Sequence, residues 1–196
     1  MIFIKHKINT LEALNNTNIK YGVEIDLRSY KNSIYLHHDP FKKGVLFTKW
    51  IKKFRHRLIV LNVKEEGLEK KILEILKINK VKKFFFHDQS FSSLINNMKK
   101  TKVSIRYSEF ELLNNTNYLF KYIKWVWIDN FFKLKLDKKF LIYLKKKKIK
   151  VCIVSPELIN KNRIKEIKQV SIFLKKNSFL VDAICTKNPE IWEKYL

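Results

Sequence analysis

The chain has 196 residues, of which 46% are hydrophobic and 31% are charged. This composition excludes a disordered chain, and the length is enough for one sizeable core, so we expect a single domain over residues 1–196. The two cysteines, both in apolar runs, exclude a disulfide framework. No apolar run approaches the ~18 residues of a membrane span, and Lys5 ends the apolar start of the chain too early for a signal peptide. We therefore expect a soluble, cytoplasmic protein.

The net charge of +24 comes mostly from lysine. Nucleic-acid-binding proteins favour arginine for bidentate contacts with bases and phosphates, and here arginine occurs only at positions 28, 55, 57, 106 and 163. Lys, Asn, Ile, Phe and Tyr are abundant and share A/T-rich codons, so the base composition of the gene is the simplest cause of the charge. We expect solvated lysine faces, at most weak contact with anionic membranes, and no nucleic-acid partner.

Short apolar runs rich in β-forming residues alternate with amphipathic stretches along the chain. Eight such runs predict strands, at residues 2–6, 23–27, 58–63, 83–87, 103–107, 125–129, 151–155 and 183–186. An extra hairpin arm is predicted at residues 34–36. Apolar residues at helical spacing predict helices, the clearest of them at residues 67–78, 138–147 and 163–175.

This repeated alternation predicts an α/β fold with a parallel sheet, and eight units favour closure into a (β/α)8 TIM-type barrel. Such barrels typically need ~250 residues. A chain of 196 residues must therefore form a compact barrel with shortened helices and loops. An open, doubly wound sheet is the alternative.

The segment with the clearest chemical pattern is Gly22-Val23-Glu24-Ile25-Asp26-Leu27-Arg28. Because side chains alternate along a strand, Glu24, Asp26 and Arg28 face one way and the apolar residues between them face the other. Two carboxylates ~6–7 Å apart on one strand can share a hard divalent cation such as Mg²⁺ or Ca²⁺. A structural network of buried ion pairs is the alternative.

Other polar residues also stand at the ends of predicted strands. Asn62 and Lys64 share one face at the end of the third strand, and Glu109 follows the fifth. His6 ends the first strand and His38 follows the hairpin arm, so one imidazole can stand on each side of the carboxylate pair. An imidazole beside a metal-bound phosphate can act as a general acid or base near neutral pH.

Taken together, these segments resemble the opening of the glycerophosphodiester phosphodiesterases, which belong to the phosphatidylinositol-phospholipase-C-like barrels. The resemblance is carried by His6, Asn9-Thr10-Leu11-Glu12-Ala13-Leu14, residues 22–28 and His38-Asp39-Pro40-Phe41. It is dense to about residue 66 and continues weakly to residues 182–186 and Pro189. It implies a phosphoric diester hydrolase that cleaves a phosphodiester next to an alcohol, often glycerol.

The resemblance also implies roles for individual residues. His6 and His38 would be the general acid and base, and Glu24 and Asp26 would bind the metal. The chain departs from the family pattern at two places. Lys7-Ile8 stands where the family has Arg-Gly, and Asn62 stands where a third carboxylate is typical, two residues before Lys64. An amide oxygen can still ligate a hard cation, but without negative charge.

We therefore predict a metal-dependent phosphodiesterase of lipid metabolism, with Mg²⁺ or Ca²⁺ held by Glu24, Asp26 and Asn62. Its substrate would be a glycerophosphodiester-like or lipid-derived phosphodiester. The residues expected to contact that substrate are Lys7, Arg28, Lys64 and Glu109. Two alternatives stay open: an impaired barrel that binds a phosphorylated ligand, and a basic protein that binds polyanions or membrane surfaces.

Overall fold

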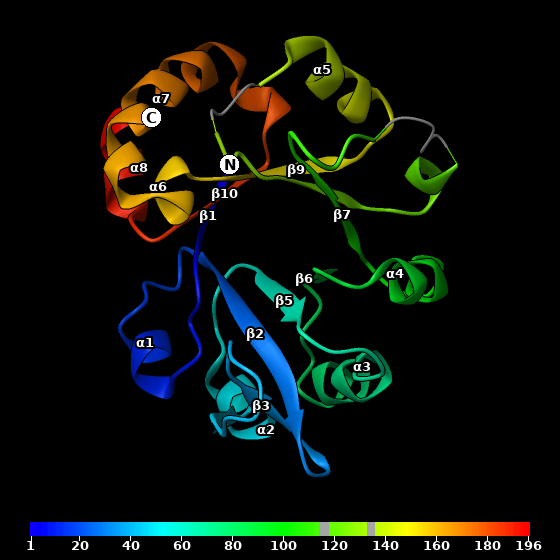
Figure 1. The fold of residues 1–196 in the computed structure, drawn as a ribbon. Coiled ribbons are helices and arrows are strands. Elements are labelled where there is room, and N and C mark those ends of the chain that lie inside the picture. The colour runs from blue at the N-terminus through cyan, green and yellow to red at the C-terminus, as the bar shows by residue number, and fades with distance from the viewer. Residues whose placement is uncertain (114–117, 133–135) are drawn as a thin grey trace. The chain divides into compact units, whose positions relative to one another are not determined.

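The computed structural model describes residues 1–113, 118–132 and 136–196 (Figure 1). These residues form two compact units. We call Met1–Lys5 together with Ser104–Leu196 the C-terminal unit, and His6–Val103 the N-terminal unit. In the described part of the chain, no helix combines the length and the apolarity needed to cross a membrane. The single domain expected over residues 1–196 stays a prediction.

The C-terminal unit is built on a parallel sheet. Its strands are β1 (Ile2–Lys5), β7 (Ser104–Tyr107), β8 (Trp125–Ile128), β9 (Lys150–Val154) and β10 (Ala183–Thr186). Strands β7, β8, β9 and β10 pair in chain order, and β10 also pairs with β1. In a (β/α)8 barrel the first strand pairs with the last, whereas a doubly wound sheet keeps these strands apart.

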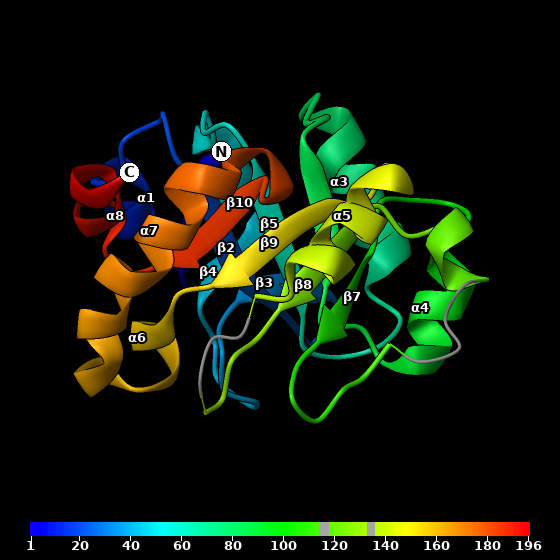
Figure 2. The same cartoon turned by 90° about the horizontal axis from the view of Figure 1, so that it is seen from above.

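Helices cover this sheet. They are α5 (Lys138–Lys146), α6 (Pro156–Ile159), α7 (Glu166–Asn177) and α8 (Pro189–Tyr195), with 3₁₀ turns η2 (Leu119–Lys121), η3 (Lys161–Lys165) and η4 (Ser178–Leu180). Figure 2 shows α5 and α7 lying over one face of the sheet. Each of these helices has a buried apolar side. On α5 it carries Leu141 and Leu144, and on α7 it carries Ile167 and Leu174, at helical spacing.

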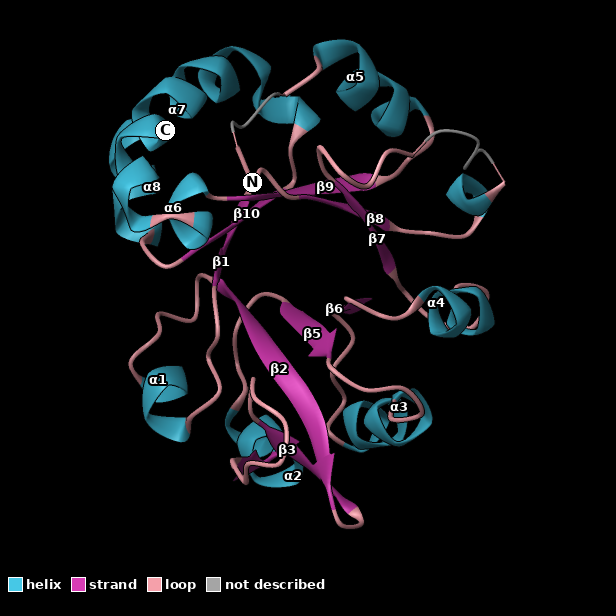
Figure 3. Cartoon of the chain, viewed as in Figure 1, coloured by secondary structure: helices cyan, strands magenta, loops and turns pink. Residues whose placement is uncertain are grey.

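The N-terminal unit also contains a parallel sheet, extended by a hairpin. Its strands are β2 (Gly22–Tyr30), β3 (Ser33–Leu36), β4 (Val45–Leu46), β5 (Ile59–Val63) and β6 (Phe84–His87). Figure 3 shows β2 as the long strand of this unit. It pairs in parallel with β5, and β5 pairs in parallel with β6. On its other edge β2 pairs with β3, which in turn pairs with β4, both antiparallel.

The helices of the N-terminal unit are short. They are α1 (Leu11–Asn15), α2 (Phe47–Trp50), α3 (Glu69–Ile78) and α4 (Phe91–Asn97), with the 3₁₀ turn η1 (Ile51–Lys53). Two of them begin at side-chain caps. Thr10 Oγ1 accepts a hydrogen bond from Ala13 N at the start of α1, and Ser90 Oγ accepts one from Ser93 N at the start of α4.

The eight predicted strands and the hairpin arm are confirmed, and the predicted parallel pairing is found within each unit. Each of the eight runs forms a strand, and residues 34–36 lie in β3. The helix predicted at residues 163–175 begins as the 3₁₀ turn η3 and continues as α7. Cys152 and Cys185 are buried free thiols. The two-residue strand β4 and the polar helix α4 were not predicted.

Candidate functional site

Two carboxylates are buried side by side on β2. Glu24 is 1% exposed and Asp26 is 0% exposed. In the parallel register with β5, Asp26 stands opposite Asn62, and Asn62 stands opposite His87 of β6. A buried carboxylate is costly unless hydrogen bonds or an opposite charge compensate it. The contacts of these two acids therefore define what the site can bind.

Glu24 receives hydrogen bonds on both carboxylate oxygens. The main-chain N–H of Lys7 donates to Oε2 at 2.7 Å, and Asn62 Nδ2 donates to Oε1 at 3.0 Å. His6 Nε2 lies 3.8 Å from Oε2. Burial raises the pKa of Glu24 to about 7, and the neighbouring charge of Asp26 adds to that rise. A cation bound between the two acids would instead lower the pKa of Glu24, because it favours the ionised carboxylate.

Asp26 is held by Asn9, a residue to which the sequence had assigned no role in the site. Asn9 Nδ2 donates to Asp26 Oδ2 at 2.8 Å, and the main-chain N–H of Asp26 donates to Asn9 Oδ1 at 2.9 Å. The other carboxylate oxygen, Oδ1, is buried without a hydrogen bond and lies 3.7 Å from Lys64 Nζ. Asn9 thus binds one oxygen of the Asp26 carboxylate, Oδ2, and the other oxygen, Oδ1, lies near the Lys64 ammonium.

These donors fit a hard divalent cation. Glu24 and Asp26 supply carboxylate oxygens, and Asn62 supplies an amide oxygen, Oδ1, that is buried without a hydrogen bond. A half-turn of the amide exchanges its donor for its acceptor, so Asn62 can serve either Glu24 or a cation. In the described residues no group of three or more His, Cys, Asp or Glu side chains could hold a metal. An oxygen set of two acids and one amide suits a cation that also takes oxygens from substrate and water.

Lys64 follows β5 and links two acids. Its Nζ lies 2.8 Å from Asp88 Oδ2 and 3.7 Å from Asp26 Oδ1. Asp88, in the segment after β6, has a positive φ of 60°, which is uncommon for a residue with a side chain. The ammonium is mostly buried between the carboxylates, so Lys64 brings a positive charge to the site without any metal.

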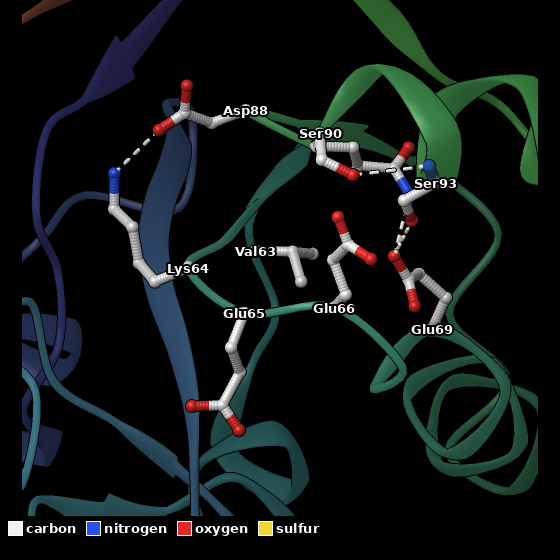
Figure 4. A pocket seen from close by; sticks show the side chains of 9 residues that line it. Val63, Lys64, Glu65, Glu66, Glu69, Asp88, Ser90 and Ser93 are labelled. Atoms are coloured by element: carbon white, nitrogen blue, oxygen red, sulfur yellow. Dashed lines mark hydrogen bonds and ion pairs between the residues drawn. The ribbon is translucent and has the colours of Figure 1, made fainter.

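A pocket of about 320 Å³ opens beside Lys64. It lies between the segments that follow β5 and β6, and its lining residues are Val63, Lys64, Glu65, Glu66, Glu69, Asp88, Gln89, Ser90 and Ser93. Figure 4 shows Lys64 reaching Asp88 on one side of the pocket and Glu69 bonded to Ser93 on the other. The lining is rich in hydrogen-bond acceptors, which suits a ligand that carries hydroxyl groups.

Arg28 and His38 lie together on the hairpin side of β2. Arg28 Nε donates to the carbonyl of His38 at 2.8 Å, and its Nη1 donates to the carbonyl of Lys64 at 3.3 Å. Arg28 thereby fixes the segments that carry both residues. The half-exposed His38 ring contacts Asp39, with Nδ1 3.0 Å from Asp39 Oδ1. This hydrogen bond is the main reason why the pKa of Asp39 falls to about 2.

The neighbouring His37 makes a different contact: its Nδ1 accepts a hydrogen bond from the main-chain N–H of Asp39.

The remaining predicted residues are Lys7 and Glu109. The side chain of Lys7 is exposed, and its backbone has a positive φ of 56°, which accompanies the turn of its N–H towards Glu24. Glu109 belongs to the C-terminal unit, whereas the other predicted site residues belong to the N-terminal unit. Its two carboxylate oxygens accept hydrogen bonds from the main-chain N–H groups of Phe131 and Phe132.

Comparison with known proteins gives a clear structural answer. No protein-family model matches the sequence, and no curated protein matches it. A glycerophosphodiester phosphodiesterase from Thermotoga maritima has a TM-score of 0.70 and 19% identity, covering 100% of this chain and 98% of that one. An Oleispira antarctica phosphodiesterase, solved with the product sn-glycerol-3-phosphate, has a TM-score of 0.71 and 15% identity, covering 100% and 96%.

The chain has the fold of the glycerophosphodiester phosphodiesterases. A third such enzyme, from Agrobacterium tumefaciens, agrees with a TM-score of 0.69 and 11% identity over 99% of both chains. The resemblance seen in the sequence is thus confirmed for the fold, and the α/β TIM-type barrel is confirmed with it.

Proposed function

We propose that this protein is a phosphoric diester hydrolase that acts on a glycerophosphodiester-like or lipid-derived phosphodiester. The observation that carries the proposal is the buried pair Glu24 and Asp26, with His6 Nε2 only 3.8 Å from Glu24 Oε2. Two buried acids next to an imidazole are a costly arrangement for a purely structural role. The family fold and the family motif around the same residues support the same reaction.

Glu24, Asp26 and Asn62 would hold a divalent cation, Mg²⁺ or Ca²⁺. When bound, this cation would polarise a non-bridging oxygen of the phosphodiester. The carboxylates provide two negative charges and Asn62 none, so we expect weak binding that improves when a phosphate completes the coordination. Asn9 and the N–H of Lys7 hold the two carboxylates in position.

His6 and His38 would exchange protons with the reacting groups. One imidazole would take the proton from the attacking hydroxyl or water, and the other would protonate the leaving alcohol. His6 stands next to Glu24 and so next to the cation site. The carbonyl of His38 accepts a hydrogen bond from Arg28, and its half-exposed ring contacts Asp39.

Lys64 would contact the phosphate of the substrate. Its ammonium lies beside Asp26 and borders the pocket after β5 and β6. We propose that this pocket receives the alcohol part of the diester, since its carboxylates can accept hydrogen bonds from hydroxyl groups. Lys7, exposed next to His6, is a second candidate for phosphate contact, as a point charge in place of the forked guanidinium of arginine.

A second candidate function is the binding of a phosphorylated ligand without turnover. Two contacts favour it. Asn62 donates to Glu24 rather than adding a third carboxylate, and Lys64 already places a positive charge 3.7 Å from Asp26. In that case the site would hold a phosphomonoester or a diester through Lys64 and would need little metal.

Turnover assays separate the two candidates. Purified protein is incubated with a panel of glycerophosphodiesters and with bis(p-nitrophenyl) phosphate, each with Mg²⁺, with Ca²⁺ and with a chelator. The proposal predicts metal-dependent release of a phosphomonoester, abolished in the isosteric variant Glu24→Gln. Calorimetric binding of sn-glycerol-3-phosphate, with no turnover under any metal condition, would replace the hydrolase by the ligand-binding protein.

A further inference from the structure

Three phenylalanine rings gather on the surface of the C-terminal unit. Phe110 follows β7, and Phe131 and Phe132 follow β8. The Phe110 ring centroid lies 5.6 Å from that of Phe131 and 5.4 Å from that of Phe132. The three side chains are 67%, 39% and 71% exposed, in chain order. A single exposed ring is ordinary, but rings that contact one another while facing solvent form an apolar patch that usually marks an interaction site.

The backbone beneath this aromatic cluster is held in place by charged side chains. Glu109 accepts hydrogen bonds from the N–H groups of Phe131 and Phe132, each at 3.1 Å. Arg163 Nη1 donates to the carbonyls of Asn130 and Phe131, at 2.6 Å and 3.3 Å. A carboxylate and a guanidinium from two other segments thus fix the residues that present the rings. The exposure of the cluster is therefore a feature of the fold.

Two arginines form ion pairs with the acids near the cluster. Arg106 Nε lies 3.0 Å from Asp129 Oδ2 and 3.7 Å from Glu111 Oε2. Arg163 binds Glu166, with its Nε 2.7 Å from Oε1. Lysines remain outward: Lys161 and Lys165 are exposed on η3, the same turn that supplies Arg163. The four acids near the rings are balanced by two arginines and two lysines, so the positive charge that favours an anionic surface is that of the chain as a whole, +24.

We infer that the cluster of Phe110, Phe131 and Phe132 docks the protein on an anionic lipid bilayer. Aromatic side chains enter the boundary between headgroups and acyl chains, while lysines are attracted to anionic lipid within a Debye length of the surface. A protein partner fits less well, because stable protein interfaces bury ~800 Å² per partner, more than three rings can supply. The cluster follows the carboxyl ends of β7 and β8, and barrel enzymes carry their chemistry at that edge of the sheet.

Vesicle binding tests this inference with the full chain. Cosedimentation is measured with phosphatidylcholine vesicles and with vesicles that also contain phosphatidylglycerol, at low and high salt. The wild type should bind only the anionic vesicles, and less at high salt. The double variant Phe110→Ser/Phe132→Ser should bind ~10-fold or more weakly, since burying even part of two rings contributes about that factor. Phe179→Ser is the matched control, because Phe179 is also 67% exposed and lies in η4.

Several results would overturn the inference. They are no binding of the wild type to anionic vesicles, equal binding by the double variant, or an equal loss in the Phe179→Ser control. A self-association of the wild type that disappears in the double variant, without vesicle binding, would assign the cluster to a second copy of the chain. The thermal unfolding of each variant should match the wild type. Turnover of a water-soluble glycerophosphodiester should be the same in the double variant and the wild type. A failure of the membrane inference would therefore leave the proposed hydrolase activity standing, and the reverse also holds.

Discussion

The side-chain amide of Asn9 binds Asp26 at two points, its main-chain N–H and its carboxylate oxygen Oδ2. A short amide side chain can do this only while the two backbones stay in register. The consequence is that the Asp26 side chain has one orientation, with Oδ1 beside the Lys64 ammonium and available to a cation. Asn9 is therefore a positioning residue for the cation site.

Asn9→Ala should weaken divalent metal binding ~10–100-fold, the loss usual when a partner of a metal ligand is removed. Titration calorimetry with Mg²⁺ and Ca²⁺ measures it. The matched control is Thr10→Ala, which removes the neighbouring cap of α1 and should cost ~1 kcal/mol of stability with no change in metal affinity. Equal metal affinity in Asn9→Ala and Thr10→Ala would reduce Asn9 to a structural residue.

His6→Ala and His38→Ala should each lower kcat by ~10²–10⁴-fold, the contribution typical of a general acid or base. Neither side chain is fully buried, so the free energy of unfolding should change little. His37→Ala is the control for His38, because its ring instead accepts a hydrogen bond from Asp39 N and should affect kcat only mildly. If His37→Ala proves the more damaging change, the acid–base role moves to His37.

Asn62→Asp should bind Mg²⁺ and Ca²⁺ more tightly than the wild type in the absence of substrate. The variant adds a third carboxylate beside Glu24, where the wild type has only an amide. Calorimetric titration of both forms measures the difference, and Asn62→Ala serves as the control for loss of the side chain. Unchanged or weaker binding in Asn62→Asp would place residue 62 outside the coordination sphere.

Glu24 should make metal-free stability fall as the pH rises. Its pKa is about 7 in the folded protein against an ordinary value of 4.5, so between these pH values the folded state binds the additional proton. The stabilisation is fully present below pH 4.5 and is lost as the pH passes 7. Urea unfolding across this range measures it.

The difference between wild type and Glu24→Gln isolates this effect. The buried His56, whose pKa is lowered by burial, titrates with the opposite sign in both proteins and cancels. Added Mg²⁺ should raise stability more at pH 8 than at pH 5, because only the ionised carboxylates bind it. A wild-type curve parallel to that of Glu24→Gln would show that the Glu24 carboxyl does not titrate in this range.

The sequence was sufficient for the strands because parallel strands buried on both faces appear as continuous apolar runs. The sequence also predicted that Glu24 and Asp26 share one face of a strand, because side chains alternate along a strand. Helix α4 escaped prediction because most of its residues are polar or small, with a single buried leucine, Leu94. Its start is fixed by the cap at Ser90 rather than by an apolar pattern.

The loop contacts of the site could not be predicted. Asn9 reaches Asp26 from a segment that follows Lys7, and Asp88 reaches Lys64 from the segment after β6. Lys7 and Asp88 both have positive φ, and no glycine stands at either position to signal the turn. Glu109 accepts hydrogen bonds from Phe131 N and Phe132 N along a loop path that strand and helix patterns do not encode, and its contact with substrate stays a prediction.

The pairing of β1 with β10 ties the site to the order in which the chain is made. His6 directly follows β1, and the register places Lys5 opposite Thr186, so the strand that leads into the first site residue has its partner about 180 residues later. During synthesis, Glu24, Asp26 and Asn62 can come together long before β10 exists. Strand β1, which leads into His6, gains this partner only when β10 has emerged.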